Sequence, residues 1–433
     1  MKKGVLITSK IILLLALLNV YSFSVRHVSI GGEKLGFLTD PLQNFIEFPL
    51  IVKSVFTEFE NPEPYHVYAD TGFKEINHLD YDLFALNAHV DQQGNSYLYE
   101  LKNLKNNDVL HTWEFSIDNF EGDSKLFPVA HPQNPILLED SSLIGMLYET
   151  KNLFRLDSES NLVWSNHSIK FHHSINLSGD YLWACGWEDA YTWNEHSNNS
   201  TSFRDDLLVK IDINSGEILY KKSLASVLIE NNRIDLVHGA ANDETDEGLE
   251  VFHINDIQPI LSDGTYWKKG DLLISLRNRS SIILYRPENN EILRVISGPF
   301  LLQHDVDILS PHEISVFNNN RTSTYTSIDH QTDTPPKSIL KSSNVVVYDL
   351  ESDEFSTPFL DVFQRENVYS PRQGLHEFLS NGDLFIESTE QGKIFIIRND
   401  DIIFQQYPNR INEKGTTEYP HWMRIYEDLE FLN

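Results

Sequence analysis

Six segments of similar layout recur along the chain, and this repetition limits the fold more than any other feature of the sequence. Each segment is a short β-rich run, then a turn rich in Asp, Asn, Ser or Gly, then a second apolar run. This pattern predicts a β-hairpin. The segments are Tyr97–Phe115, Leu153–Ser165, Val209–Tyr220, Ile283–Arg294, Val345–Thr357 and Ile394–Tyr407.

Each hairpin follows another predicted pair of strands, so each repeat supplies a four-stranded sheet. Examples of these preceding pairs are His172–Trp183, Lys269–Leu276 and His376–Glu387. The hairpins begin about 49 to 74 residues apart, somewhat more than the ~40–50 residues of familiar propeller repeats. Six such sheets predict an all-β chain folded as a six-bladed β-propeller. The alternative, two separate β-sandwiches, gives no reason for six similar units.

The chain is expected to have four parts, of which the first is the segment of residues 1–25. The propeller is expected over residues 81–407, after an N-terminal extension at residues 26–80 and before a C-terminal tail at residues 408–433. Either the residues after Pro408 or those before Tyr81 are expected to supply the strand that closes the ring. Two polar insertions, Asn194–Arg204 and Asn318–Ser343, are expected to be exposed, either as solvated loops or as lids over one face.

The N-terminus has the pattern of a targeting segment. Lys2, Lys3 and Lys10 precede an uncharged apolar run that ends before Arg26. Basic residues followed by about 7–15 apolar residues predict a secretory signal over residues 1–25. The alternative is an uncleaved membrane anchor over residues 4–25, which would include Lys10. Both interpretations predict export to the periplasm or the cell exterior.

Composition excludes several classes of function. The chain has 34 Lys and Arg against 64 Asp and Glu, a net charge of −30, which argues against non-specific nucleic-acid binding. Its single cysteine, Cys185, excludes an intrachain disulfide and any Cys-x-x-Cys metal or redox site. Forty per cent hydrophobic residues are enough for a buried core.

The candidate chemistry lies at the starts of predicted inner strands. Nucleophile-elbow, zinc-helix, phosphate-loop and dinucleotide motifs are absent from the sequence. In a propeller the first strand of every blade lines the central channel, so equivalent positions on different blades converge. Several of these strands begin with histidines, namely His172, His173, His253, His304 and His376. Arg277 ends the strand LLISLR, and we expect it to share one funnel with these histidines.

Four short motifs with an upstream double-histidine element resemble the core of the aryl-sulfate sulfotransferase family. They are Phe171–His173 (FHH), His253–Ile257 (HINDI), Leu273–Asn278 (LISLRN), Gln303–Asp305 (QHD) and Phe317–Asn319 (FNN). The resemblance in layout extends from about Leu83 to Tyr407. It implies an exported six-bladed propeller that moves a sulfuryl group from an aryl sulfate to a phenol through a transient sulfohistidine.

The resemblance also implies roles for individual residues. His304 would be the nucleophile, with His253, Arg277 and one of His172 and His173 as supporting catalytic residues. Asn255 is expected to contact the substrate. His376 is expected to do so as well, on its place in its strand alone, because the family pattern has no histidine there. Neither a cofactor nor a metal is implied, and the expected partners are small molecules, a membrane being involved only through the N-terminal segment.

Two other functions remain open at this stage. The chain could be a non-catalytic propeller that serves as a binding scaffold, although a scaffold has no evident need for a guanidinium in its funnel. It could also be a metal-dependent hydrolase, since a set of histidines and aspartates could supply nitrogen and oxygen ligands: His172, His173, His304, Asp305 and Asp307. The segment Asp212–Leu219 is also similar to a quinoprotein blade, but it lacks the tryptophan of that repeat.

Overall fold

The structure is a computed structural model that describes most of the chain after residue 64. The described residues are 13–14, 17, 19–24, 65–90, 96–116, 131–193, 201–237, 243–245, 248–321 and 342–432. The chain divides into two compact units, Met1–Glu63 and Pro64–Asn433. Most of the predicted leader lies outside the described residues, and those of its residues that are described are helical. Within the described part of the chain, no helix is both long enough and apolar enough to cross a bilayer.

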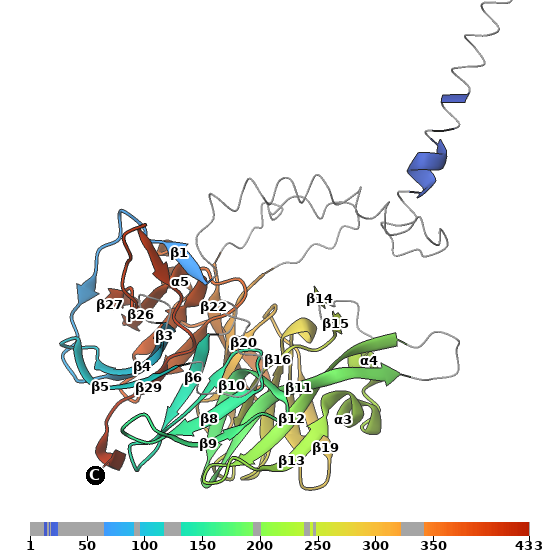
Figure 1. Ribbon diagram of the computed structural model, residues 1–433, viewed down its shortest axis with the longest axis horizontal. Helices are drawn as coiled ribbons and strands as arrows, with labels where there is room; N and C mark the ends of the chain where they lie inside the picture. The colour runs from blue at the N-terminus through green and yellow to red at the C-terminus, as the bar shows by residue number, and fades with distance from the viewer. Residues whose placement is uncertain are drawn as a thin grey trace, which may run out of the picture. The chain divides into compact units, whose positions relative to one another are not determined.

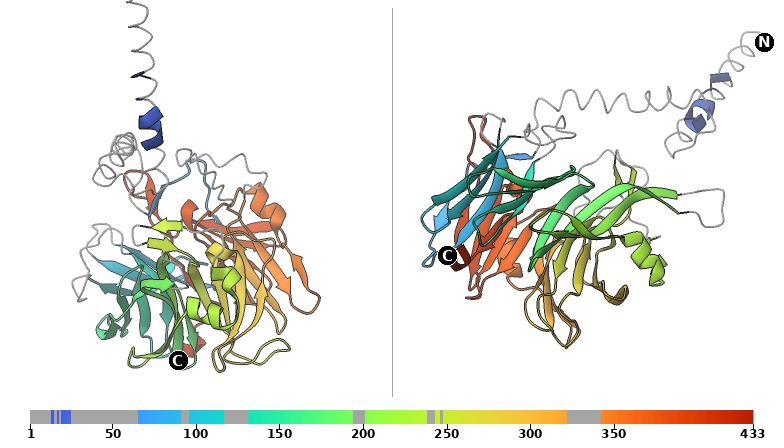
Figure 2. Two further views of the ribbon diagram at one scale, coloured as in Figure 1. Left: turned by 90° about the vertical axis from the view of Figure 1, so that its right-hand side faces the viewer. Right: turned by 60° about the horizontal axis from the view of Figure 1, so that its bottom comes forward.

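The second unit contains six antiparallel sheets of four or more strands, which form the six blades of a propeller (Figures 1 and 2). The all-β, six-bladed prediction is confirmed. From the innermost strand outward, blade one contains β29 (Arg424–Tyr426), β3 (Phe84–Val90), β4 (Tyr97–Asn103) and β5 (Asp108–Phe115). Blade two contains β6 (Pro132–Leu137), β7 (Leu143–Leu147), β8 (Asn152–Leu156) and β9 (Leu162–Asn166). Blade three contains β10 (Lys170–Ser178), β11 (Tyr181–Trp193), β12 (Thr201–Asp212) and β13 (Ile218–Ser223).

The remaining blades repeat the same order. Blade four contains β16 (Ile254–Pro259), β17 (Leu272–Leu276), β18 (Ser281–Arg286) and β19 (Glu291–Ile296). Blade five contains β20 (His304–Ile308), β21 (Glu313–Asn318), β22 (Asn344–Asp349) and β23 (Glu354–Ser356). Blade six contains β24 (Leu375–Phe378), β25 (Leu384–Ser388), β26 (Lys393–Arg398) and β27 (Asp401–Gln406). Neighbouring blades touch through their first strands, so these strands surround the centre.

The six predicted hairpins are the two outer strands of the six blades. Each hairpin turn contains a residue in the left-handed region, which Asn, Asp and Gly adopt more readily than other residues. These turn residues are Asn107, Ser160, Gly216, Asn290, Asp353, Asn399 and Asp400. Polar turn chemistry in the sequence therefore fixes the position of every outer hairpin.

The C-terminal segment closes the ring. Strand β29 pairs with β3 of blade one, with Ile425 opposite Ala85. The Tyr426 hydroxyl accepts a hydrogen bond of 2.9 Å from the backbone N–H of Leu137 in blade two. The innermost strand of blade one therefore comes from the residues after Pro408.

The segment before Tyr81 also belongs to the propeller unit, which begins at Pro64 rather than at residue 81. Strand β2 (Ile76–Asn77) extends blade six on its outer edge beside β27, and β1 (His66–Tyr68) pairs with β28 (Thr416–Glu418).

Blade three has the largest additions. A two-stranded ribbon of β14 (Asp243–Thr245) and β15 (Gly248–Glu250) joins its sheet, and two short helices, α3 (Leu224–Glu230) and α4 (Ile234–Val237), follow β13. Of the first predicted loop, Thr201–Arg204 belongs to β12, and residues 194–200 lie outside the described residues. Residues 322–341 of the second predicted loop also lie outside them, so its proposed action as a lid stays a prediction.

The core consists of six apolar clusters, one between each pair of neighbouring blades. Cys185 is buried in the cluster between blades three and four as a free thiol. The remaining short helices are η4 (Arg277–Arg279), α5 (Leu360–Arg365), η5 (Thr389–Gln391) and η6 (Glu430–Leu432). Because every blade is packed on two sides, the ring holds its central strands rigidly.

Candidate active site

The inner strands carry their functional side chains on irregular backbone. A residue with positive φ lies at or just before the first residues of all six inner strands: Asn134, His173, His253, Asp305, Gly374 and Trp422. In four of these strands the pairing register also shifts at this place, as in a β-bulge. A bulge re-aims a side chain, and non-glycine residues with positive φ cluster at functional sites.

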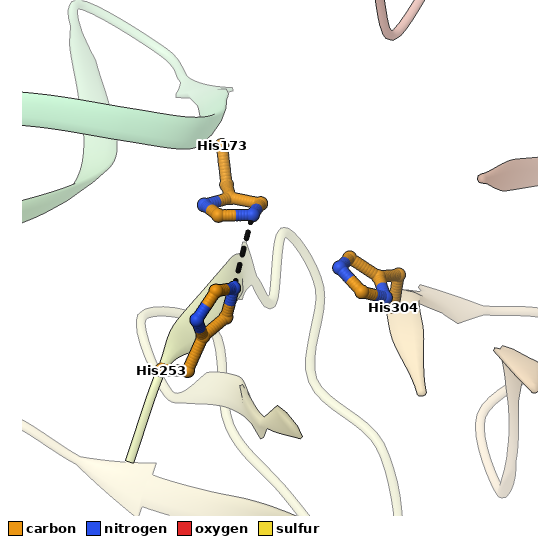
Figure 3. A group of neighbouring side chains, drawn as sticks. All are labelled: His173, His253 and His304. Carbon is orange, nitrogen blue, oxygen red and sulfur yellow. Dashed lines mark hydrogen bonds between the residues drawn. The ribbon is translucent and has the colours of Figure 1, made fainter. Parts of the chain in front are cut away.

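Three histidines from three blades meet at this level of the channel. One ring nitrogen each of His173, His253 and His304 lies within 4.8 Å of the others. The Nε2 atoms of His173 and His253 are 3.2 Å apart, and one ring nitrogen of His304 faces this pair (Figure 3). His173 and His304 are fully enclosed, while the His253 side chain is 13% exposed. Of the adjacent pair His172 and His173, it is therefore His173 that joins the cluster.

A series of buried side chains in contact runs from Glu250 through His253 and His173 to His172. The Glu250 carboxylate lies 2.8 Å from His253 Nδ1, and Arg204 lies 3.0 Å from the same carboxylate group. His173 Nδ1 lies 2.8 Å from Nδ1 of His172. Three imidazoles are thus joined in series, with a carboxylate at the open end, which is an arrangement that can hold and move a proton.

Asp206 contacts two histidines of the same series, His172 and His253. Its carboxylate accepts a 3.0 Å hydrogen bond from the backbone N–H of His253 and lies 3.7 Å from His172 Nε2. Burial raises the pKa of Asp206 to about 8. Burial alone would raise the pKa of Glu250 as well, but the adjacent His253 and Arg204 hold it well below its usual range. Glu250 is therefore ionised at neutral pH.

A single amide sets the tautomer of His304. The Nδ2 group of Asn319 donates to the carbonyls of Ser370 and Gln373, at 2.7 Å each, so its Oδ1 must be the atom that faces His304. That Oδ1 lies 2.7 Å from His304 Nδ1, which must then carry the proton. His304 Nε2 keeps its lone pair and has no hydrogen-bond partner in the described part of the molecule.

Burial keeps the imidazoles neutral. It lowers the pKa of His304 well below 6.5, and the positive charges of Arg277 and His253 lower it further. Burial likewise lowers the pKa values of His172 and His173, aided by their positive neighbours. A neutral imidazole with a free Nε2 can act as a nucleophile or as a metal ligand.

Arg277 and Asn255 lie beside the cluster. The backbone N–H of Arg277 donates to the His253 carbonyl at 3.1 Å, and its guanidinium is buried beside Asn278. The Asn255 side chain donates at 2.6 Å to the carbonyl of Gln303, the residue before His304. Asn255 thus joins blade four to the strand that carries His304.

His376 lies elsewhere. Its Nδ1 is 2.8 Å from Asp305 and its Nε2 is 2.7 Å from the Ser315 hydroxyl. It lines a cavity among the inner strands together with Asp256, Asp305, Trp422 and Arg424. Because His376 comes two residues after Gly374, the positive-φ residue of its strand, it lies further along the channel than the other histidines. His376 is therefore not a member of the imidazole cluster, and its predicted contact with the substrate stays a prediction.

The same division separates the ligands predicted for a metal-dependent hydrolase. His173 and His304 belong to the imidazole cluster, whereas Asp305 and Asp307 gather with His376. His172 belongs to neither group and serves as a partner of His173.

Comparison with known proteins places this site in a family. A family model described as arylsulfotransferase (ASST) matches residues 134–410, which is more than half of the chain. The chain belongs to the arylsulfotransferase family. This confirms the predicted resemblance, and the matched span contains His173, His253, Arg277 and His304.

Solved structures similar to this arylsulfotransferase-family chain share little sequence with it. A protein of unknown function from Bacteroides caccae is 11% identical, with 81% of this chain and 100% of that chain covered and a TM-score of 0.49. The Dos1 propeller is 11% identical over 79% of this chain and 76% of its own, with a TM-score of 0.39. A catalytically inactive virginiamycin B lyase from Staphylococcus aureus with quinupristin is 10% identical over 77% and 88%, also with a TM-score of 0.39. Among curated proteins there is no match.

Several residues around the arylsulfotransferase-family site were not predicted. Glu250, Asp206 and Asn319 contact the histidines from other strands, and Trp422 comes from the ring-closing segment. The Trp422 ring lies edge-on to His173 and His304, with centroid distances of 5.9 and 6.0 Å. Tyr148 lies edge-on to His173 at 5.2 Å. Two of them had a signal in the sequence. Glu250 is an acidic residue three positions before a histidine already singled out, and Asn319 ends the motif Phe317–Asn319, although its contact with His304 was not predicted.

Proposed function

We propose that this protein moves a sulfuryl group from an aryl sulfate to a phenolic acceptor, with His304 as the nucleophile. Family membership supports arylsulfotransferase-type chemistry in general. The observation that carries the finer assignment is the hydrogen bond from His304 Nδ1 to Asn319, because it leaves the Nε2 lone pair facing the other two imidazoles.

In the first half-reaction, His304 Nε2 attacks the sulfur of the donor. An N–S bond forms, the S–O bond to the aryl group breaks, and its electron pair leaves on the aryl oxygen. His253, whose Nδ1 lies 2.8 Å from the Glu250 carboxylate, acts as the general acid and gives an Nε2 proton to that oxygen. The products are a free phenol, a sulfohistidine at His304 and a neutral His253.

The second half-reaction reverses these roles. The hydroxyl oxygen of the acceptor phenol attacks sulfur, the N–S bond breaks, and its electron pair returns to His304 Nε2. His253 takes the proton of the acceptor hydroxyl. The hydrogen-bonded series from His253 to His173 and His172 can share the positive charge that His253 regains when it takes this proton.

Arg277 supplies the positive charge for the transferring group. A sulfuryl group in transfer spreads negative charge over three oxygens, much as a phosphoryl group does, so positioning and electrostatics dominate catalysis. A guanidinium can hold two of these oxygens at once, which an ammonium cannot match. The positive charge of Arg277 lowers the pKa of His304. This supports a position of the guanidinium close to the imidazole.

The aromatic rings beside the histidines favour aryl compounds as both the donor and the acceptor of the sulfuryl group. Tyr148 and Trp422 both present rings to His173, and Trp422 also contacts His304. Edge-to-face contacts between aromatic rings stabilise by about 0.5–1.5 kcal/mol beyond area burial. We propose that the rings of donor and acceptor phenol are held here in turn.

We further propose that the protein is exported, on the pattern of residues 1–25. Fractionation of the producing cells and N-terminal sequencing of the recovered protein test this. Export predicts activity outside the cytoplasm, with the leader either cleaved near Ser24 or kept as an anchor. Recovery of the intact chain in the cytoplasm alone would contradict it.

The transferase assignment is tested with 4-nitrophenyl sulfate as donor and phenol as acceptor. We expect sustained nitrophenolate release only when phenol is present, together with formation of phenyl sulfate. Nitrophenolate release at the same rate without phenol, with inorganic sulfate as the product, would indicate a hydrolase instead. No release with any aryl sulfate would favour a binding scaffold.

A further inference from the structure

The three converging imidazoles also have the arrangement of a transition-metal ligand set. We propose that His173, His253 and His304 bind one divalent ion of the zinc class through their Nε2 atoms, and that this ion excludes the sulfuryl donor. The metal site follows from the geometry alone, and only the exclusion rests on the proposed function.

The nitrogen atoms are already close to the spacing that a metal requires. Zinc–nitrogen bonds of about 2.0–2.1 Å in a tetrahedral site place two ligand nitrogens about 3.4 Å apart. His173 Nε2 and His253 Nε2 lie 3.2 Å apart, and the group of three falls within 4.8 Å. A rotation of the His304 ring that moves Nε2 by about 1 Å would bring all three within reach of one ion.

The opposite nitrogen of every ring has a partner that holds the ring in the required orientation. Nδ1 of His253 lies 2.8 Å from Glu250, Nδ1 of His173 lies 2.8 Å from His172, and Nδ1 of His304 lies 2.7 Å from Asn319. Metal-binding histidines almost always have a partner for their second nitrogen, which fixes the tautomer and makes the ring a better ligand. All three rings can therefore direct an unprotonated Nε2 at the same point.

The other cluster of potential ligands is a weaker candidate for this class of metal. In the described part of the chain, the one further group of this kind is Asp305, Asp307 and His376. There both nitrogens of His376 already have partners, Asp305 at 2.8 Å and Ser315 at 2.7 Å. Carboxylate oxygens prefer Mg²⁺, Ca²⁺ or Mn²⁺, whereas imidazoles prefer zinc, copper and nickel.

The charged groups around the three imidazoles are compatible with a bound cation that carries an anionic fourth ligand. The Glu250 carboxylate lies 2.8 Å from Nδ1 of His253, and this acidic group behind the ring favours a cation. Arg277 opposes a bare cation, but it is a suitable partner for hydroxide or for an oxygen of sulfate at the fourth position.

The test uses Co²⁺ as a visible probe for a zinc site in the full-length protein freed of metals with a chelator. We expect one equivalent of Co²⁺ to bind with the intense visible absorption of a four-coordinate ion, and Zn²⁺ to displace it. His253→Ala and His304→Ala should each weaken binding at least 100-fold. The matched control is His376→Ala, which removes the histidine of the other cluster and should bind as the unsubstituted protein does.

Two results would overturn the metal site: no binding of Co²⁺ to the unsubstituted protein, or loss of binding in His376→Ala with retention in His253→Ala. If the histidine variants fail to fold, the proton NMR spectrum of the Co²⁺ complex decides. Three shifted, exchangeable signals, one for each Nδ1–H, are expected, and fewer than two would contradict a three-histidine site.

The exclusion is measured separately, through nitrophenolate release in the presence of phenol. One equivalent of Zn²⁺ should abolish release, and a chelator should restore it. Zinc that binds yet leaves the rate unchanged, or raises it, would overturn the exclusion while leaving the metal site in place. A protein that binds Co²⁺ but never releases nitrophenolate would instead count against the proposed function alone.

Discussion

The tautomer of His304 depends on one neighbouring amide, that of Asn319. Asn319→Leu removes the acceptor for Nδ1–H, so the proton is free to occupy Nε2 and block attack. We expect sulfuryl transfer to fall by about 10²–10⁴-fold, the range seen when a catalytic histidine loses its orienting partner. The measurement is the burst of nitrophenolate from 4-nitrophenyl sulfate without acceptor.

The control is Asn320→Leu, in the neighbouring residue, whose amide donates to the Ser342 carbonyl instead. It should keep most of the burst rate. Nitrogen-15 NMR of the imidazole should also show the Nδ1–H tautomer in the unsubstituted protein and a changed mixture in Asn319→Leu. Equal losses in both variants with an unchanged tautomer would mean that Asn319 is only structural.

Arg277 is expected to stabilise charge on the transferring group. Arg277→Lys keeps a positive charge but loses the two-pronged contact, and removing one preorganised donor typically costs about 10²–10³ in kcat. Arg279→Lys is the control in the same short helix, because Arg279 donates to the Leu236 carbonyl at 2.6 Å and lies over Phe252. If Arg277→Lys turns over as fast as Arg279→Lys, the clamp is refuted.

The low pKa of His304 predicts an unusual pH profile. An ordinary histidine titrates near 6.5, and a nucleophile of that kind would lose half its rate by about pH 6.5. Here burial and Arg277 lower the pKa, so the neutral, attacking form persists to lower pH. We expect protonation of His304 to cause no loss of burst rate as pH falls from about 8 to 6, and a decline only below that. A midpoint at about pH 6.5 would show that the site is more open to water.

The sequence was sufficient to predict the strands of the six blades, but not every residue of the site. Hairpins repeat because each needs alternating apolar residues and a polar turn, and both are local signals. His253 and His304 could be predicted as neighbours because they hold similar places on successive inner strands. His376 could not be separated from them, because the positive φ at Gly374 that offsets it is set by packing. Glu250 and Asn319 act through contacts between different strands, which a local pattern does not record.

The closing strand is the element on which the ring depends. Deleting residues 424–433 removes β29, the Tyr426 bond to Leu137 and four apolar side chains that pack against the core between blades one and two: Tyr426, Leu429, Phe431 and Leu432. Partial burial of these side chains stabilises by roughly 4 kcal/mol in total, at about 1.5–3 kcal/mol for each fully buried one. We expect Tm to fall by about 5 °C, or folding to fail. Thermal unfolding followed by circular dichroism measures this, and an unchanged Tm would show that the ring does not need β29.

For the whole molecule, the division at residue 63 predicts that the propeller unit is independent of what precedes it. The chain of residues 64–433 should unfold within about 2 °C of the full chain, because Leu79 is the first of the described residues that belongs to an interblade cluster. It should also keep the acceptor-dependent release of nitrophenolate. A large drop in Tm or loss of this activity would show that the first 63 residues contribute to the fold or the site.

The central claim is that His304 carries the sulfuryl group, and intact-mass spectrometry tests it most directly. The protein is exposed briefly to 4-nitrophenyl sulfate without acceptor and then weighed. We predict a gain of one SO₃ group, its location on His304 by peptide mapping, and its loss when phenol is added. His304→Ala should show no gain, while His253→Ala should gain the group about 10²–10⁴-fold more slowly. Undiminished labelling of His304→Ala would contradict the claim.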